Sequence, residues 1–116
     1  MSVAHFDKTI HQRLSETKQI KLKNPNRVCI YMVKSTNKPS LPDLDKNKYL
    51  VPIDITVGQL AYIIRKRIHL CPAAAMFLLI NNTMLSTNLT IGELENKYMN
   101  EDGFIYIHYT TENCFG

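Results

Sequence analysis

Histidines and cysteines are the residues of this sequence best suited to catalysis or metal binding, and their spacing gives them no shared site. The four histidines and three cysteines are widely separated, at His5, His11, His69 and His108 and at Cys29, Cys71 and Cys114. None has a partner at the spacing of a metal site, and the sequence lacks the usual hydrolase, phosphate-loop and CxxC motifs. We therefore expect no enzyme: no catalytic residue, no metal and no cofactor.

A cluster of three basic residues, Arg65-Lys66-Arg67, is the next candidate for chemistry. It is suited to contact with a phosphate group, or it simply forms the solvated face of a helix. No aromatic residues are interleaved with these charges, so the pattern expected of single-stranded nucleic-acid binding is weak.

The stretch Lys46–Pro52 combines lysines with the pattern of a short strand. Alternation divides such a strand into two faces, with Lys48 and Leu50 on one and Tyr49 and Val51 on the other. Its final proline has no N–H to donate, which favours a position at the edge of a sheet. Lysines at an edge can block unwanted strand pairing, or the edge can accept a guest strand whose side chains enter flanking pockets. The pattern alone leaves both interpretations open.

Length and charge narrow the class of protein. The chain has 116 residues, enough for one domain with its own core. A formal net charge of +4 and a pI of about 9.0 favour anionic partners such as acidic peptide, nucleic acid or acidic lipid. The longest apolar stretch, residues 73–80, is too short to cross a bilayer, and the N-terminus lacks the apolar core of a signal peptide. We expect a cytoplasmic protein with reduced cysteines.

The elements that must position these residues begin with a helical arm. Phe6, Ile10 and Leu14 recur every four residues and Ile20 follows, in a mostly polar segment over 4–23 that the Asn-Pro-Asn sequence at 24–26 ends. Apolar and β-branched runs predict strands over 28–34, 48–52, 76–80 and 104–109. Capping boxes predict helices that begin at Thr56 and at Thr90.

This order of elements predicts an α+β, ubiquitin-like β-grasp fold with a four-stranded mixed sheet. The strands over 28–34 and 104–109 are apolar on both faces, so we place them at the sheet centre. The apolar stripe that begins at Val57 should cover one face of the sheet, and the N-terminal arm the other. We divide the chain into an N-terminal arm (1–24), a β-grasp core (25–109) and a flexible C-terminal tail (110–116).

A long and ordered set of motifs resembles the GABARAP-type autophagy modifiers. The matching segments are DLDK at 43–46, KYLVP at 48–52, DITVGQ at 54–59, IRKRIHL at 64–70, NN at 81–82, ED at 101–102 and FG at 115–116. The similarity covers essentially the whole chain. It implies the same β-grasp fold, with two additional N-terminal helices.

The resemblance also implies that Gly116 is the reacting group of a modifier. In this family a ubiquitin-activating-like enzyme and a conjugating-like enzyme transfer the C-terminal glycine to phosphatidylethanolamine, and a cysteine protease processes and delipidates the protein. Glycine suits this role because it has no Cβ to obstruct an enzyme cleft, and the seven-residue tail (110–116) reaches roughly 23 Å when extended. The lipidated protein would decorate autophagosomal membranes and recruit cargo receptors with aromatic-x-x-aliphatic motifs. We expect a monomer in solution and no nucleic-acid partner.

By the same resemblance, two pockets should flank the 48–52 edge. The aromatic pocket is assigned to Glu16, Ile20, Lys48, Leu50 and Phe104. The aliphatic pocket is assigned to Tyr49, Val51, Pro52, Ile55, Leu60 and Ile63. The acidic flank of the peptide should meet Lys46, Lys48, Arg27 and Arg67. The alternative is a basic β-grasp interaction domain that is never conjugated and binds acidic peptides or nucleic acid.

Overall fold

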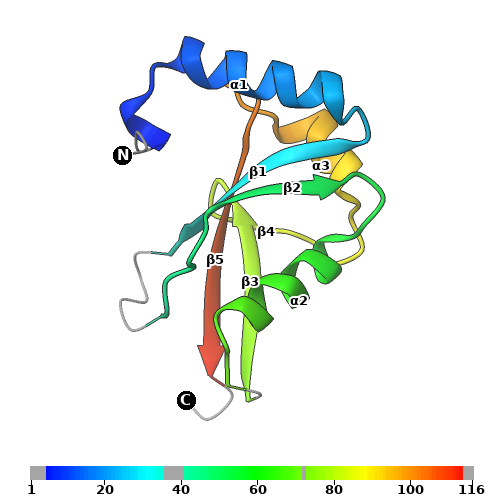
Figure 1. The fold of residues 1–116 in the computed structure, drawn as a ribbon. Helices are drawn as coiled ribbons and strands as arrows, with labels where there is room; N and C mark the ends of the chain where they lie inside the picture. The colour runs from blue at the N-terminus through cyan, green and yellow to red at the C-terminus, as the bar shows by residue number, and fades with distance from the viewer. Residues whose placement is uncertain (1–4, 36–40, 72, 114–116) are drawn as a thin grey trace.

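The computed structural model describes residues 5–35, 41–71 and 73–113, which form a mixed sheet packed against helices (Figure 1). The helical elements are η1 (His5–Asp7), α1 (Ile10–Lys23), α2 (Val57–Arg67) and α3 (Ile91–Tyr98). The strands are β1 (Arg27–Lys34), β2 (Lys48–Pro52), β3 (Ala74–Ile80), β4 (Thr83–Met84) and β5 (Ile105–Asn113). The short element η1 is a 3-10 turn, so the N-terminal arm has two helical parts.

The sheet has the strand order β2-β1-β5-β3-β4, which confirms the β-grasp plan. The strands β1 and β5 run parallel in the interior and β2 lies at an edge, as predicted. The predicted count of four strands was wrong by one, because β4 has two residues and is too short for an alternating pattern. It pairs with β3 across Asn81-Asn82, whose positive φ angles of 52° and 63° suit a two-residue hairpin turn.

Threonine side chains begin the three α-helices. The Thr56 hydroxyl accepts from the Gln59 N–H at 3.2 Å, and the Gln59 side chain accepts from the Thr56 N–H at 2.9 Å, which confirms the predicted capping box. Thr90 caps α3 through its hydroxyl oxygen. A further capping box between Thr9 and Gln12 begins α1 and was not predicted. These local bonds satisfy N–H groups that would otherwise lack partners at the helix starts.

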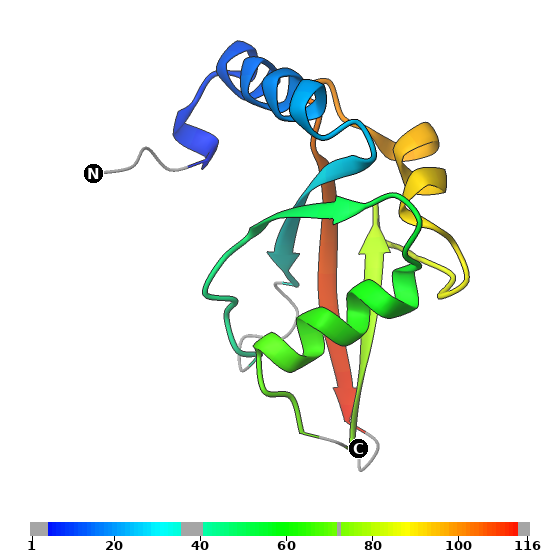
Figure 2. The same ribbon diagram turned by 45° about the vertical axis from the view of Figure 1, so that its right-hand side comes forward.

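The main core lies between α2 and one face of the sheet, as predicted (Figure 2). Apolar side chains of α2 pack against alternate residues of the two central strands. The buried set includes Val57, Leu60 and Ile64 of α2, Val28, Ile30 and Met32 of β1, and Ile105, Ile107 and Tyr109 of β5. Because these strands are covered on this face and paired on both edges, they form a rigid support for the edge strand β2.

The N-terminal arm packs on the other face of the sheet, near the start of β1 and β5 (Figures 1 and 2). His5 stacks on Tyr31, with ring centroids 4.2 Å apart, and its Nε2 lies 2.8 Å from the Tyr106 hydroxyl. Tyr31 alternates with the core residues Ile30 and Met32, so its side chain points away from α2. This arrangement confirms the predicted place of the arm.

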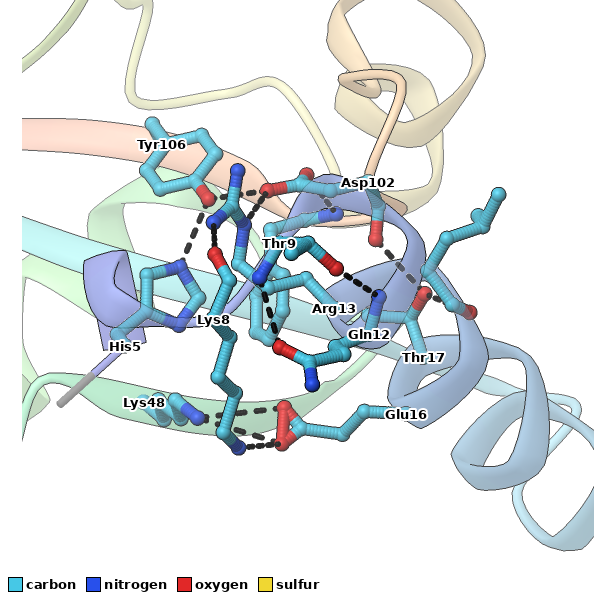
Figure 3. Close-up of polar contacts among 12 residues, drawn as sticks. His5, Lys8, Thr9, Gln12, Arg13, Glu16, Thr17, Lys48, Asp102 and Tyr106 are labelled. Atoms are coloured by element: carbon cyan, nitrogen blue, oxygen red, sulfur yellow. Dashed lines mark hydrogen bonds and ion pairs between the residues drawn. The ribbon is translucent and has the colours of Figure 1, made fainter. Parts of the chain in front are cut away.

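Buried Asp102 anchors α1 to the loop before β5 (Figure 3). Its carboxylate accepts a hydrogen bond from Arg13 Nε at 2.9 Å and another from the Tyr106 hydroxyl. The Thr17 hydroxyl donates to its carbonyl oxygen at 2.8 Å. Burial alone would raise the pKa of Asp102, but the hydrogen bonds from Tyr106, the Phe104 N–H and Arg13 outweigh it and lower the pKa. The ionised form of Asp102 therefore holds the arm.

Close packing of α1 on this loop requires a glycine. Gly103 has a φ of 84°, a conformation that other residues rarely adopt. A Cβ at this position would lie 2.1 Å from the Thr17 hydroxyl oxygen. Thr17 and Gly103 therefore determine how closely α1 approaches the sheet, and α1 forms one wall of the candidate site.

The last strand continues beyond its predicted end. Strand β5 runs from Ile105 to Asn113, and its final residues pair with Ala74–Phe77 of β3. The prediction stopped at Tyr109 because the next residues are polar and give no hydrophobic signal. Four residues of the predicted tail are thus strand, and the remaining residues 114–116 lie outside the described ranges.

Candidate functional site

The outer edge of β2 carries backbone groups that are suited to pairing with a guest strand. The Met32 N–H donates to the Asn47 carbonyl at 2.8 Å, and the Ile53 N–H also donates across the ladder at 3.0 Å. Residues of an antiparallel pair alternate between facing the partner strand and facing away. Positions 47, 49, 51 and 53 therefore face β1, and Lys48 and Leu50 direct their N–H and C=O groups outward.

A hollow of about 190 Å³ lies between β2 and α1 and is called the aromatic hollow below. Its lining includes every residue predicted for the aromatic pocket: Glu16, Ile20, Lys48, Leu50 and Phe104. The lining also includes Cys29, Lys46 and Tyr49. Phe104 is buried, whereas Leu50 is 38% exposed and forms part of the accessible surface. The structure brings the predicted residues together, and their role in peptide binding stays a prediction.

An ion-pair cluster closes the rim of the aromatic hollow (Figure 3). Carboxylate oxygens of Glu16 lie 3.2 Å from Lys8 Nζ and 3.2 Å from Lys48 Nζ. Burial would raise the pKa of Glu16, but hydrogen bonds from Lys48 and then Lys8 outweigh it and lower the pKa. Lys48 Nζ also lies 5.7 Å from the centroid of the Phe104 ring. The rim therefore holds two cations on one carboxylate and keeps an excess of positive charge.

The residues predicted for the aliphatic pocket differ in their exposure. Val51 and Leu60 belong to the buried core, with Leu60 only 1% exposed, and Tyr49 and Ile55 pack against that core. In this conformation Val51 and Leu60 have little surface to offer to a ligand. Ile63 is 43% exposed on α2 and is the accessible member. Pro52 is half-buried at the end of β2.

The four basic residues predicted for an acidic flank fall into two groups. Lys46 Nζ and Arg67 Cζ lie 5.1 and 5.7 Å from the centroid of the Tyr49 ring. Lys48 lines the neighbouring aromatic hollow, so these three cations share one end of the edge. Arg27 lies at the opposite end of the β1–β2 ladder, where its Nη1 is 3.5 Å from the Leu50 carbonyl oxygen. Their contact with an acidic flank stays a prediction, in which Arg27 would meet a different part of the peptide from the other three residues.

Cys29 lines the aromatic hollow in addition to the five residues assigned to it. It is buried on the arm side of β1, and burial, followed by the charge of Glu16, raises the pKa of its thiol. A protonated, buried thiol is a poor nucleophile. Its contact with the hollow depends on where α1 packs, and the local sequence carries no signal of that packing.

The described residues contain neither a cluster suited to a metal ion nor a helix suited to a membrane. Within these ranges, no group of three or more histidine, cysteine or carboxylate side chains is arranged to hold a metal ion. No helix in the same ranges has the length and apolar character needed to cross a bilayer. Gly116, the predicted conjugation residue, lies outside the described part of the chain.

Comparison with protein families gives a match over most of the chain. The model described as "Autophagy protein Atg8 ubiquitin like" matches residues 12–116. Among curated proteins, Autophagy-related protein 8B of Oryza sativa subsp. indica is 40% identical over 111 residues, covering 96% of this chain and 92% of that protein. The protein of the same name from Oryza sativa subsp. japonica matches equally well.

Solved structures show the same fold over nearly the full length. The crystal structure of Trypanosoma brucei ATG8 superposes with a TM-score of 0.87 at 34% identity, covering 100% of this chain and 99% of that chain. Plasmodium falciparum Atg8, solved in complex with a Plasmodium falciparum Atg3 peptide, has a TM-score of 0.82 at 29% identity, covering 97% of this chain and 98% of that chain.

Proposed function

This chain belongs to the Atg8 family of ubiquitin-like autophagy proteins, and on that premise we propose that it is a lipid-conjugated modifier that recruits short peptides. Its C-terminal Gly116 is conjugated to phosphatidylethanolamine on autophagic membranes. Its β2 edge binds cargo receptors and adaptors that carry aromatic-x-x-aliphatic motifs. The protein acts as a carrier of these contacts and performs no catalysis of its own.

The peptide-binding half of the proposal is carried by one observation. Lys48 and Leu50 direct their backbone groups outward, beside a hollow lined by every residue assigned to the aromatic pocket. A guest strand would gain main-chain hydrogen bonds from the edge and specificity from the hollow. The related Plasmodium falciparum protein was solved with an Atg3 peptide bound, which supports a peptide-binding role for this chain and a conjugating-like enzyme among its partners.

The conjugation half rests on family membership and on the C-terminal residue. The carboxylate of Gly116 would be adenylated by an activating-like enzyme, with release of pyrophosphate, and then attacked by a cysteine thiolate, with release of AMP. A second cysteine thiolate of the conjugating-like enzyme takes the acyl group as a thioester. The lipid amine finally attacks the thioester, forms an amide and frees the thiol. Each transfer needs close approach to the carbonyl carbon, which glycine permits. A cysteine protease would reverse the attachment.

A reconstituted lipidation reaction tests the whole proposal. Purified protein, both enzymes, ATP and liposomes containing phosphatidylethanolamine should give a product with the mass of the lipid amide. Deletion of Gly116 should eliminate that product while peptide binding persists, because the terminus lies beyond the strand that supports the site. Phe115→Ala serves as a control that keeps the reacting glycine. Lipidation of the deletion variant would refute the role of Gly116.

The alternative, a basic domain that is never conjugated, is tested by the lipidation reaction, and its nucleic-acid form is tested further by salt dependence. Exposed charges are screened beyond roughly 10 Å at 0.1 M salt, so binding of an acidic peptide should weaken moderately as salt increases. Nucleic-acid binding would fall far more steeply because it releases counterions. Tight nucleic-acid binding at physiological salt without peptide binding would favour the alternative.

A further inference from the structure

A second hollow of about 350 Å³ lies on the other side of α1, between α1, β1 and the end of α3. We call it the α1–α3 hollow. It is larger than the aromatic hollow of about 190 Å³ and falls within the range of roughly 300–1,000 Å³ typical of small-molecule sites. Ile20 and Cys29 line both hollows and therefore separate them. None of the predicted peptide-site roles accounts for this second space.

The interior of the α1–α3 hollow is aliphatic. Its apolar lining consists of Leu14, Ile20, Val28, Cys29 and Met99, and no aromatic ring contributes among the described residues. The aromatic hollow, in contrast, is lined by Tyr49 and Phe104. Aliphatic walls present no flat surface to an occupant, whereas ring-lined walls favour flat groups, and the flexible thioether of Met99 can adapt its shape. The lining therefore suits an alkyl chain.

Basic side chains also line the same hollow. Lys21 Nζ lies 2.6 Å from Glu95 Oε2 and 3.0 Å from the Arg27 carbonyl oxygen, so it joins α1 to both α3 and β1. Lys18 and Arg27 contribute two more cations, against the single carboxylate of Glu95. An anionic group at the end of an apolar chain would meet this excess of positive charge.

A peptide fits this hollow less well than an alkyl chain does. The strand that forms its floor, β1, is paired on one side with β2 and on the other with β5, so it has no free edge. An extended peptide entering here would bury backbone N–H and C=O groups without partners, which is costly. An alkyl chain carries no such groups. We propose that the α1–α3 hollow binds a single-chain amphiphile, an unbranched alkyl chain of medium length that ends in a carboxylate.

Decanoate is the probe for this site. Titration into the full chain, below the concentration at which decanoate forms micelles, should shift the methyl resonances of Ile20 and Met99 and reach saturation. The dissociation constant should be on the order of 0.1–1 mM for a ligand of this size. From hexanoate upward, affinity should rise about fourfold per added methylene until the hollow is full, and then stop rising. Decanol and decyltrimethylammonium should bind at least several-fold more weakly.

Three variants localise the binding. Met99→Glu places a carboxylate in the apolar lining and should abolish decanoate binding, and Lys18→Glu should weaken it several-fold. Leu22→Glu is the matched control, because Leu22 is 84% exposed on the same helix and does not line the hollow. Amide spectra and peptide binding at the β2 edge verify that each variant is folded.

Several outcomes would overturn the inference. These are titrations that do not saturate, equal binding by Met99→Glu, loss of binding in Leu22→Glu, or shifts confined to Leu50 and Ile63.

Vesicles containing phosphatidylglycerol form a separate arm of the experiment. Binding to vesicles without binding to decanoate would mean that this region contacts a membrane surface, and the hollow would not be a ligand site. The decanoate titration measures neither lipidation nor peptide binding. A negative titration would therefore leave the proposed function intact.

Discussion

Glu16 Oε2 of α1 lies 3.2 Å from Lys48 Nζ of β2, so an ion pair joins the N-terminal arm to the edge strand across the rim of the aromatic hollow. Lys48 is one of the cations expected to meet an acidic peptide, yet it is already paired with a carboxylate. A guest with acidic flanks must compete with Glu16 for the same ammonium group. Glu16 therefore lines the hollow and should also lower the affinity for peptides with acidic flanks.

Replacing Glu16 should strengthen binding of acidic peptides. Glu16→Gln removes the competing charge and should lower the dissociation constant several-fold for a peptide with an acidic flank, because exposed charge pairs contribute up to about 1 kcal/mol. The same peptide with a neutral flank should change little. Isothermal titration calorimetry with both peptides measures the difference. Glu95→Gln makes the same charge change away from the aromatic hollow, and an equal gain in that variant would contradict the prediction.

The accessible members of the two pockets should dominate the binding energy. Leu50→Ala and Ile63→Ala each remove an exposed apolar contact, and burying such a side chain is worth roughly 1.5–3 kcal/mol. Each change should weaken an aromatic-x-x-aliphatic peptide about tenfold or more, and the double variant should bind below detection. Fluorescence anisotropy with a labelled peptide measures this. Leu22→Ala, on the outer side of α1, is the control, and undiminished binding by the double variant would remove the site from the β2 edge.

Acid should loosen the arm through His5, which is only 6% exposed. The Tyr106 hydroxyl donates to Asp102, so His5 Nε2 is the donor in its hydrogen bond to the Tyr106 oxygen. Burial lowers the pKa of His5, and the charges of Lys48 and Arg13 lower it further. The neighbouring carboxylates Asp102 and Glu16 oppose this shift but do not cancel it. The neutral form is therefore the one that packs.

The sign of the pH effect follows from this lowered pKa. The contribution of His5 to stability is complete above its unfolded pKa of about 6.5 and is lost as pH falls through the lower folded value. Melting temperature should decline from neutral pH toward pH of about 5 in the parent protein. His5→Phe retains an aromatic ring without a titrating group and should show a smaller decline. An identical decline in both proteins would assign the effect to other groups.

The end of β5 should have to unpair before Gly116 can react. Three residues beyond Asn113 reach roughly 10 Å, less than half of the reach estimated for a seven-residue tail. Ala75 and Glu112 are cross-strand neighbours, so cysteines at both positions in a background without native cysteines would lock the strand. Oxidation should slow thioester formation on the activating enzyme at least tenfold, and reduction should restore it. Equal rates for the oxidised and reduced forms would show that no unpairing is needed.

Local sequence patterns predicted much of this fold because several elements depend on neighbouring residues. Thr56 and Gln59 form their capping box within one helical turn, and the apolar runs of β1 and β3 reflect their burial. The strand β4 and the end of β5 were missed because one is very short and the other is polar. Their strand conformation depends on pairing with β3, which no local pattern encodes.

The candidate site was likewise predicted only in part from the sequence. The positions of Lys48, Leu50 and Phe104 around one hollow followed from the family resemblance. The anchor made by Asp102 was not predicted, because its partner Arg13 is 89 positions away in the sequence. Val51 and Leu60 were assigned to the aliphatic pocket although both are buried, since a residue type shows that a side chain is apolar but not which of its surfaces remain accessible.

The nine residues of β5 run from the arm end of the sheet to its opposite end (Figure 1). At about 3.3 Å per residue the strand is roughly 30 Å long. With a lipid on Gly116, β5 would act as a spacer that holds the aromatic hollow and the α1–α3 hollow away from the bilayer. Because the electrostatic screening length at physiological salt is about 8 Å, charges of an upright molecule at that height no longer sense anionic head groups. Lys18 and Lys48 would then select among dissolved acidic ligands in competition with one another, without interference from the membrane to which the protein is attached.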